Sequence, residues 1–144
     1  MKKINIFLDS SVMLAGLAST TGASAEILRL AEILVVKITI CNLVFEEVER
    51  NIKNKLPSLL PLFYTAIDVL NPKTMQDEIK LNKKFVHLFP KESDQIIIQT
   101  ALKSKSDYVI TLDKKHLLQP EVIKEFSMSI VSPSDFLKKF RQGF

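Results

Sequence analysis

Short apolar runs rich in β-branched residues alternate along this 144-residue chain with longer segments whose apolar residues recur at helical spacing. Buried parallel strands are short and nearly continuously apolar, and parallel neighbours need a long crossover connection, usually a helix. The expected strands are residues 4–8, 35–40, 108–112 and 129–131. The pattern therefore predicts a three-layer α/β/α fold with a central, mostly parallel sheet of four to five strands.

The segments between these strands carry signals for helix boundaries. The expected helices are residues 24–34, a segment from residue 42, 56–70, 74–85, a segment from residue 93, 121–126 and a segment after residue 133. Ser24 and Ser93 are the expected N-caps of their helices. Pro57 lies near the start of its segment, and Pro61 should begin a new turn or kink the helix.

The length of the chain predicts one domain, residues 1–144. Its single cysteine, Cys41, excludes an intrachain disulfide, and no run of about 18 apolar residues suggests a membrane span. Lys2 and Lys3 followed by an apolar stretch resemble a secretory signal, but the charge of Asp9 interrupts that stretch. We therefore expect a cytoplasmic protein whose first strand ends at Asp9.

Two aspartates directly follow expected strands. Asp9 ends the run 4–8, and Asp113 ends the run 108–112. Ligands of open α/β sheets bind beyond the carboxyl ends of the strands, so both carboxylates should share one crevice if these strands are neighbours. Each aspartate has a simpler interpretation as the cap of the helix that follows it. Their joint position favours a shared site.

Asp94 and one of three glutamates are further candidates. Asp94 falls in the first turn of its helix, on the same face as Ala101. It either interacts with the helix dipole or joins a buried site, and both interpretations remain open. Of Glu46, Glu47 and Glu49, Glu46 points most nearly away from the apolar stripe. The other two lie at the borders of that stripe.

A group of carboxylates implies a cation, because like charges at close range are unfavourable until an ion neutralises them. Besides one cysteine, only His87 and His116 could add ligands other than oxygen, so Mg²⁺ or Mn²⁺ is expected. Such an ion activates water and stabilises charge on a phosphate. The formal charge of +4 suits an anionic partner. The residues alone thus indicate metal-dependent phosphodiester hydrolysis.

Four segments follow one another in a recognisable order. They are Leu8-Asp9-Ser10-Ser11, Val44-Phe45-Glu46-Glu47-Val48, Ser93-Asp94 with Ala101, and Asp107-Tyr108-Val109-Ile110-Thr111-Leu112-Asp113. Together these segments resemble the PIN domain, a family that includes VapC-like toxin ribonucleases, over nearly the whole chain. The aspartate helix followed by a strand ending Thr-x-Asp is the most specific part.

The resemblance implies a PIN-like fold and Mg²⁺- or Mn²⁺-dependent endonucleolytic cleavage of RNA, usually single-stranded. It also selects Glu47, the second glutamate of a Glu-Glu-aliphatic unit, as a metal ligand together with Asp9, Asp94 and Asp113. By the same resemblance, Thr111 orients water or a carboxylate at the catalytic site.

The chain departs from the family pattern after Asp113, where many members carry another acidic residue or asparagine. Here Lys114-Lys115-His116 stands instead, which leaves the number of ions open and suggests a phosphate contact. His116 is either a further metal ligand or, in the simpler interpretation that we favour, a surface histidine. Ser11 is expected to assist near the first aspartate, and Asp107 is expected to be structural. Other basic residues that could contact phosphates are Lys103, Lys105, Lys138, Lys139 and Arg141.

Other functions share parts of this pattern. A haloacid-dehalogenase-like phosphatase needs a second aspartate two residues after the first, where this chain has Ser11. A receiver-like domain needs an acidic pair before the first strand ends, and Asn5 and Phe7 do not supply it. The remaining alternative is a non-catalytic RNA-binding or scaffold PIN module.

The resemblance also implies partners beyond an RNA substrate. A VapC-like toxin has an antitoxin protein encoded beside it, which would block the acidic pocket with an inserted side chain. PIN domains commonly pair, and residues 56–70 offer more apolar surface than a small domain needs. A homodimer is therefore expected, and a membrane partner is not.

Overall fold

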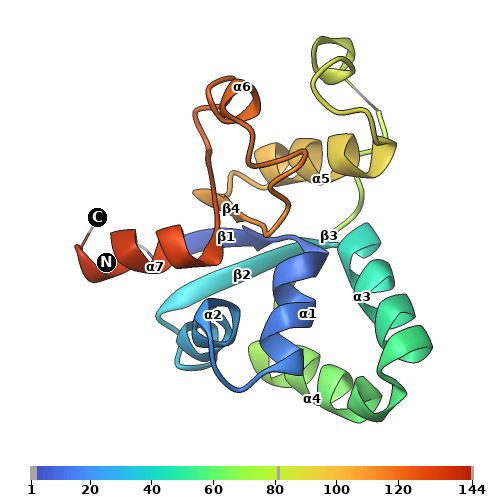
Figure 1. Cartoon of the computed structure of the whole chain (residues 1–144), viewed down its shortest axis with the longest axis vertical. Coiled ribbons are helices and arrows are strands. Elements are labelled where there is room, and N and C mark those ends of the chain that lie inside the picture. Colours follow the sequence, from blue (N-terminus) through green and yellow to red (C-terminus); the bar gives the residue numbers. More distant parts are fainter. Residues whose placement is uncertain (1–2, 81, 144) are drawn as a thin grey trace.

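The computed structural model describes residues 3–80 and 82–143, and a five-stranded sheet lies at its centre (Figure 1). The strands are β1 (Ile4–Leu8), β2 (Val36–Cys41), β3 (Lys73–Met75), β4 (Tyr108–Ile110) and β5 (Ser129–Val131). Their order in the sheet is β3-β2-β1-β4-β5, with parallel pairing throughout. The predicted parallel sheet is confirmed.

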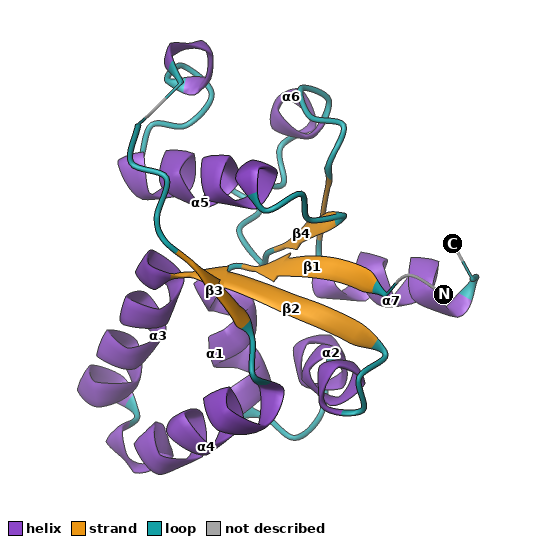
Figure 2. Cartoon of the chain, turned by 180° about the vertical axis from the view of Figure 1, so that it is seen from behind, coloured by secondary structure: helices purple, strands orange, loops and turns teal. Residues whose placement is uncertain are grey.

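Helices cover both faces of this sheet, as the two opposite views show (Figures 1 and 2). They are α1 (Ser10–Ala18), α2 (Ala23–Glu32), α3 (Asn42–Lys55), η1 (Pro57–Leu59), α4 (Leu60–Leu70), η2 (Lys83–Phe85), α5 (Glu92–Lys103), α6 (Pro120–Ile123) and α7 (Pro133–Arg141). Connections from β1 out to β3 place α1 to α4 on one face. Connections from β3 back to β4 and β5 place α5 and α6 on the other, as right-handed crossovers require. The three-layer α/β/α prediction is confirmed.

The first strand is the most deeply buried part of the sheet. Ile6, Phe7 and Leu8 are all 0% exposed, because β1 lies between β2 and β4 with helices on both faces. Burial of each such side chain contributes about 1.5–3 kcal/mol. The expected strand at 4–8 is confirmed, and Asp9 therefore stands beyond the middle of the sheet. No helix among the described residues has the length and apolarity needed to cross a membrane.

The expected N-caps Ser24 and Ser93 are wrong by two residues. α2 begins after Gly22 and α5 begins after Lys91, and neither N-cap residue makes a side-chain hydrogen bond to the first turn of its helix. Gly22 has a φ of 97°, a conformation that other residues adopt only with strain. Both serines instead lie inside the first turn. The proline prediction is confirmed, since Pro61 lies in the first turn of a new helix, α4.

The helix expected at residues 74–85 is also wrong. The described part of this segment begins in β3, continues without regular structure and ends in the single 3₁₀ turn η2. Asp77 Oδ1 accepts a hydrogen bond from the Leu43 amide at 2.8 Å, at the start of α3. The Glu78 amide donates to Thr100 Oγ1 at 2.9 Å. These bonds to distant helices satisfy polar groups that a helix would otherwise have paired locally.

The strand order reverses between the neighbouring strands β1 and β4. Chain connections leave β1 toward one edge and leave β4 toward the other, so helices do not fill the space beyond the carboxyl ends of this strand pair. Open α/β sheets bind ligands at such a switch point. Asp9 follows β1 and Asp113 follows β4, so the topology brings both aspartates to this position.

Candidate metal centre

Asp9 lies one residue beyond β1 and directly before α1. It is 7% exposed. Its Oδ1 accepts a hydrogen bond from the Ser10 amide at 2.8 Å, and its Oδ2 accepts one from the Thr111 hydroxyl at 2.7 Å. Burial raises the pKa of Asp9 above its ordinary value, although the hydrogen bonds from Thr111 and Ser10 act in the opposite direction. Asp9 thus caps α1 and is also tied to the loop after β4.

Thr111 links the carboxylate of Asp9 to the backbone of Asp113. It is 0% exposed, and besides donating to Asp9 its Oγ1 accepts a hydrogen bond from the Asp113 amide at 3.0 Å. Asp113 Oδ1 accepts hydrogen bonds from the amides of Lys115 at 3.1 Å and His116 at 3.0 Å. One buried hydroxyl therefore sets the positions of Asp9 and Asp113 relative to each other.

Glu47 reaches the same place from α3. Its Oε2 accepts a hydrogen bond of 2.8 Å from the hydroxyl of Ser10, the residue that follows Asp9. Glu46 is exposed, and Glu49 accepts a hydrogen bond from a tyrosine hydroxyl on α4. Of the three glutamates, Glu47 is therefore the one joined to the aspartate end of α1. The sequence motifs did not predict a role for Ser10, and its position directly after Asp9 was the only feature that could have indicated one.

Asp94 enters from the first turn of α5. It is 7% exposed, and its Oδ2 has no hydrogen-bond partner among the described residues. Burial, followed by the charges of Asp113 and Asp9, raises the pKa of Asp94 to about 6, while His116 and Lys91 act in the opposite direction. A buried carboxylate oxygen without a partner is costly. A simple interaction with the helix dipole does not account for this burial.

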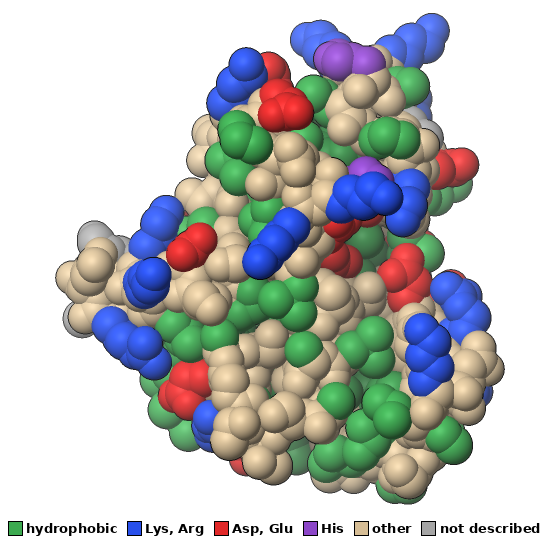
Figure 3. Space-filling view, in the orientation of Figure 1, with side chains coloured by type: hydrophobic (Ala, Val, Ile, Leu, Met, Phe, Trp, Pro, Cys, Tyr) green, Lys and Arg blue, Asp and Glu red, His purple; other side chains and the backbone are tan. Residues whose placement is uncertain are grey.

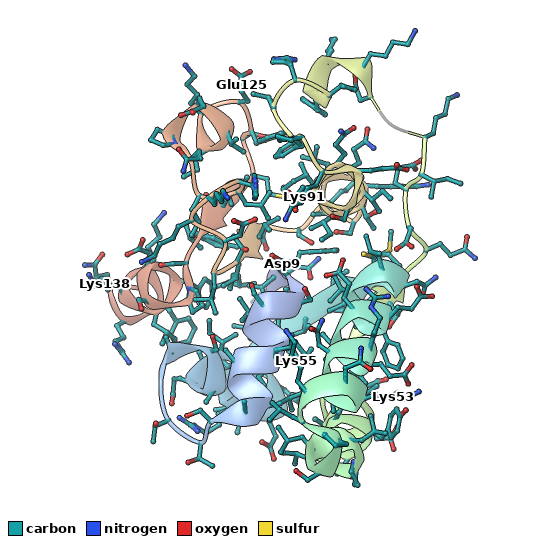
Figure 4. All side chains as sticks on the ribbon, turned by 45° about the vertical axis from the view of Figure 1, so that its right-hand side comes forward. Asp9, Lys53, Lys55, Lys91, Glu125 and Lys138 are labelled. Carbon is teal, nitrogen blue, oxygen red and sulfur yellow. The ribbon has the colours of Figure 1, made fainter. Side chains whose placement is uncertain are left out.

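Electrostatic interactions link each of the four carboxylates to at least one of the others. Glu47 and Asp113 raise the pKa of Asp9, and Asp113 and Asp9 raise the pKa of Asp94. Figure 3 shows acidic side chains gathered in a hollow, with histidine and lysine side chains along its upper border. Figure 4 places Asp9 at the end of α1 below Lys91. The structure thus brings together residues from four separate segments.

Asp94, Asp113 and His116 form the tightest part of this cluster. One potential ligand atom of each lies within 4.8 Å of the others. His116 is half-buried, because its side chain is 18% exposed and its Nδ1 lies 3.5 Å from Asp113 Oδ2. An oxygen-rich donor set with a partnerless carboxylate oxygen fits a hard divalent cation.

Two other expected residues have structural contacts. Ser11 Oγ accepts a hydrogen bond from the Leu112 amide at 3.2 Å, which ties α1 to the loop after β4. Asp107 Oδ2 accepts one from the Asn5 amide at 2.8 Å, at the opposite ends of β4 and β1 from the cluster. Asp107 is therefore structural, as expected, and Ser11 supports the loop that carries Asp113.

The basic residues divide into those beside the cluster and those elsewhere. Lys114 and Lys115 are exposed and follow Asp113 directly. Lys91 was missed by the sequence reasoning, although it acts electrostatically on Asp94 and precedes the same helix. In contrast, Lys103 forms an ion pair with Glu78 at 3.1 Å.

The remaining basic residues lie away from the acidic cluster. Lys105 lines a cavity with Asp107, at the end of β4 opposite the cluster. Lys138 and Arg141 line a cavity with Arg29, between α2 and α7. Figure 4 shows Lys138 on a different part of the surface from Asp9.

Comparison with known proteins agrees with this geometry. A family model described as PIN domain matches residues 5–115. The chain belongs to the PIN-domain family. The matched residues include all four carboxylates of the cluster together with Thr111. The resemblance seen in the sequence motifs is therefore confirmed, and it places the chain in a family of nucleases.

A solved structure shares the fold of this PIN domain. A chain in the crystal structure of VapBC2 from Rickettsia felis, bound to a DNA fragment from their promoter, superposes with a TM-score of 0.61. The alignment has 12% identity and covers 89% of this chain and 97% of that chain. Identity at this level shows likeness of fold alone. A search of curated proteins found no match.

Proposed function

We propose that this PIN domain is an endoribonuclease that hydrolyses phosphodiester bonds of single-stranded RNA with Mg²⁺ or Mn²⁺. The observation that carries the proposal is the meeting of the four carboxylates with a buried, partnerless oxygen on Asp94. Such crowding is unfavourable without a cation, so the arrangement supports ion binding. The family match supports nuclease chemistry.

The residues at the site would have different roles. Asp9, Asp94 and Asp113 would hold the ion, with Glu47 on the α3 side. When bound, such an ion supplies a water of lowered pKa and stabilises charge on the phosphate. Thr111 holds the Asp9 carboxylate and the backbone of Asp113 in set positions, so little rearrangement has to precede the reaction.

The surroundings of the cluster support an RNA strand as substrate. Lys91, Lys114 and Lys115 are exposed beside the acidic hollow, where they would contact phosphates. The large aromatic residues that are fully buried belong to the core and are Phe7, Phe63, Phe89 and Phe136. Binding should therefore depend more on backbone charge than on base stacking, and weaken strongly with salt.

The alternative is a non-catalytic RNA-binding or scaffold module. Four carboxylates would repel a phosphate backbone, and a module that only binds RNA gains nothing from them. Their convergence on one hollow therefore favours the enzyme. The two functions differ in a simple measurement, because only the enzyme produces shortened RNA when a divalent ion is added.

Cleavage of a labelled single-stranded RNA in Mn²⁺ should be lost on addition of EDTA and in the variants Asp9→Asn and Glu47→Gln. Each substitution removes one negative charge at nearly constant size, and the expected loss is at least about 100-fold. Glu46→Gln is the matched control, since this neighbouring glutamate is exposed and its variant should stay within about twofold of wild type. Undiminished cleavage by both acidic variants would contradict the assigned mechanism.

We also propose that the enzyme is the toxin of a toxin–antitoxin pair and acts in the cytoplasm. The fold shared with a chain of the VapBC2 complex supports this proposal. Expression should arrest growth, and co-expression of the protein encoded beside it should restore growth. Asp9→Asn should be harmless when expressed at the same level. Toxicity that persists in this variant would show that RNA cleavage is not its cause.

A homodimer remains part of the proposal. Leu62, Tyr64 and Val69 on α4 are 47%, 40% and 56% exposed, so this helix presents apolar surface to solvent. Exposed apolar patches of this kind mark protein contact sites. Sedimentation of the purified chain over a range of concentrations, with Val69→Glu for comparison, would give its oligomeric state.

A further inference from the structure

His116 differs from the four carboxylates because its potential ligand atom is a nitrogen. It belongs with Asp94 and Asp113 to the one group of three potential metal ligands found among the described residues. Asp94 comes from α5, whereas Asp113 and His116 share the loop after β4. The family resemblance assigned no role to this histidine.

The backbone of the loop holds His116 toward the cluster. Asp113 Oδ1 accepts hydrogen bonds from the amides of Lys115 and His116, and this turn leaves Asp113 Oδ2 facing the imidazole. The distance from Nδ1 to that oxygen is 3.5 Å. Two ligands about 2.1 Å from one octahedral ion lie about 3.0 Å apart at right angles and about 4.2 Å apart on opposite sides. The observed spacing falls between these limits.

A second observation points to a ligand at the same place. Asp94 is 7% exposed, and its Oδ2 lacks a hydrogen-bond partner within the described chain. An ion-pair role for His116 would engage Asp113 but would leave this buried oxygen without a partner. A cation shared by all three residues would satisfy Asp94 and also use the imidazole nitrogen.

We propose that His116 is a direct metal ligand through Nδ1, together with Asp94 and Asp113, and that it makes the site prefer Mn²⁺ over Mg²⁺. The inference rests on the proposed function, since it requires an ion at the carboxylate cluster. Mg²⁺ binds oxygen ligands and dehydrates reluctantly, whereas imidazole suits transition metals. A nitrogen ligand therefore favours Mn²⁺ in relative terms.

Electron spin-echo envelope modulation of bound Mn²⁺ tests the inference directly. The method detects the ¹⁴N nucleus of a coordinated imidazole and needs no RNA or enzymatic turnover. The untagged chain has two histidines, so His87→Ala is the matched control for His116→Ala. We expect ¹⁴N modulation in wild type and in His87→Ala, and its loss in His116→Ala.

Calorimetric titration with each metal supplies the second measurement. His116→Ala should weaken Mn²⁺ binding by at least about tenfold and change Mg²⁺ binding much less. His116→Asp, which replaces nitrogen with oxygen, should shift the preference toward Mg²⁺ and covers the case in which the alanine variant does not fold.

The outcomes separate this inference from the nuclease proposal. Tight Mn²⁺ binding without ¹⁴N modulation in wild type would overturn the role of His116 and leave the carboxylate site intact. Modulation that survives in His116→Ala would also overturn it. Absence of any Mn²⁺ binding would overturn both.

Discussion

Asp94→Asn should reduce RNA cleavage by at least roughly a thousandfold and at the same time stabilise the metal-free protein at pH 7. The loss follows because the ion contributes several kcal/mol to the transition state, and each 1.36 kcal/mol changes the rate tenfold. The gain follows because the variant has no buried charge facing Asp113 and Asp9. Cleavage assays in Mn²⁺ and thermal unfolding in EDTA measure the two effects.

The sign of the stability change follows from the raised pKa of Asp94. Its carboxyl has a pKa of about 6 in the folded protein against an ordinary value of 3.8. Between these values the folded chain binds a proton that the unfolded chain has released, so stability falls as pH rises through this window. The cost reaches about 3 kcal/mol at pH 7, or about 6–12 °C in Tm. Wild type and variant should converge below pH 4.

Glu92→Gln is the matched control for Asp94→Asn. Glu92 lies in the same first turn of α5 but is exposed, so its charge has only the favourable interaction with the helix dipole. This substitution should not stabilise the metal-free protein at any pH. Equal Tm values for wild type and Asp94→Asn at pH 7 in EDTA would show that Asp94 carries no unfavourable charge.

Thr111→Val should lower both the stability of the protein and its rate of RNA cleavage. Valine has nearly the shape of threonine but cannot donate to Asp9 Oδ2 or accept from the Asp113 amide. Leaving buried polar groups unpaired costs about 1–3 kcal/mol each, so a fall in unfolding free energy of about 2–3 kcal/mol is expected. Misplacement of two carboxylates should lower metal affinity and cleavage about 10–100-fold.

Thr111→Ser distinguishes the contribution of the hydroxyl from that of the methyl group. Serine keeps both hydrogen bonds and should retain most of the metal affinity, while the lost methyl lowers stability by about 1 kcal/mol. Denaturant unfolding and Mn²⁺ titration of the two variants give the comparison. A valine variant that binds Mn²⁺ as tightly as the serine variant would show that Thr111 only fills space.

The parts of the fold that were predictable depend on local patterns. The run Ile4–Leu8 is apolar on both faces, which occurs in strands covered on both sides, and β1 is such a strand. The ends of β1 and β4 then placed Asp9 and Asp113 at one edge by a general rule of α/β sheets. Glu47 needed the family resemblance, because the helical pattern left Glu49 equally open.

The predictions that were wrong or missing concern contacts between distant segments. In the described part of residues 74–85, the pairing of β3 with β2 and the hydrogen bond from Leu43 to Asp77 replace the expected helix. His116 lies close to Asp94 only because α5 packs over the sheet beside the loop after β4. No spacing in the sequence indicates such proximity.

The sequence by itself indicated the alternation of strands and helices, the parallel sheet and the aspartates that follow β1 and β4, because these follow from hydrophobic period and chain connectivity. Only the tertiary structure showed that Ser10 donates to Glu47, that Thr111 links the Asp9 carboxylate to the backbone of Asp113 and that His116 joins the cluster. Those contacts depend on side-chain distances of a few ångströms between segments far apart in the chain. The local sequence pattern does not specify such distances, because they are set when the helices pack on the sheet.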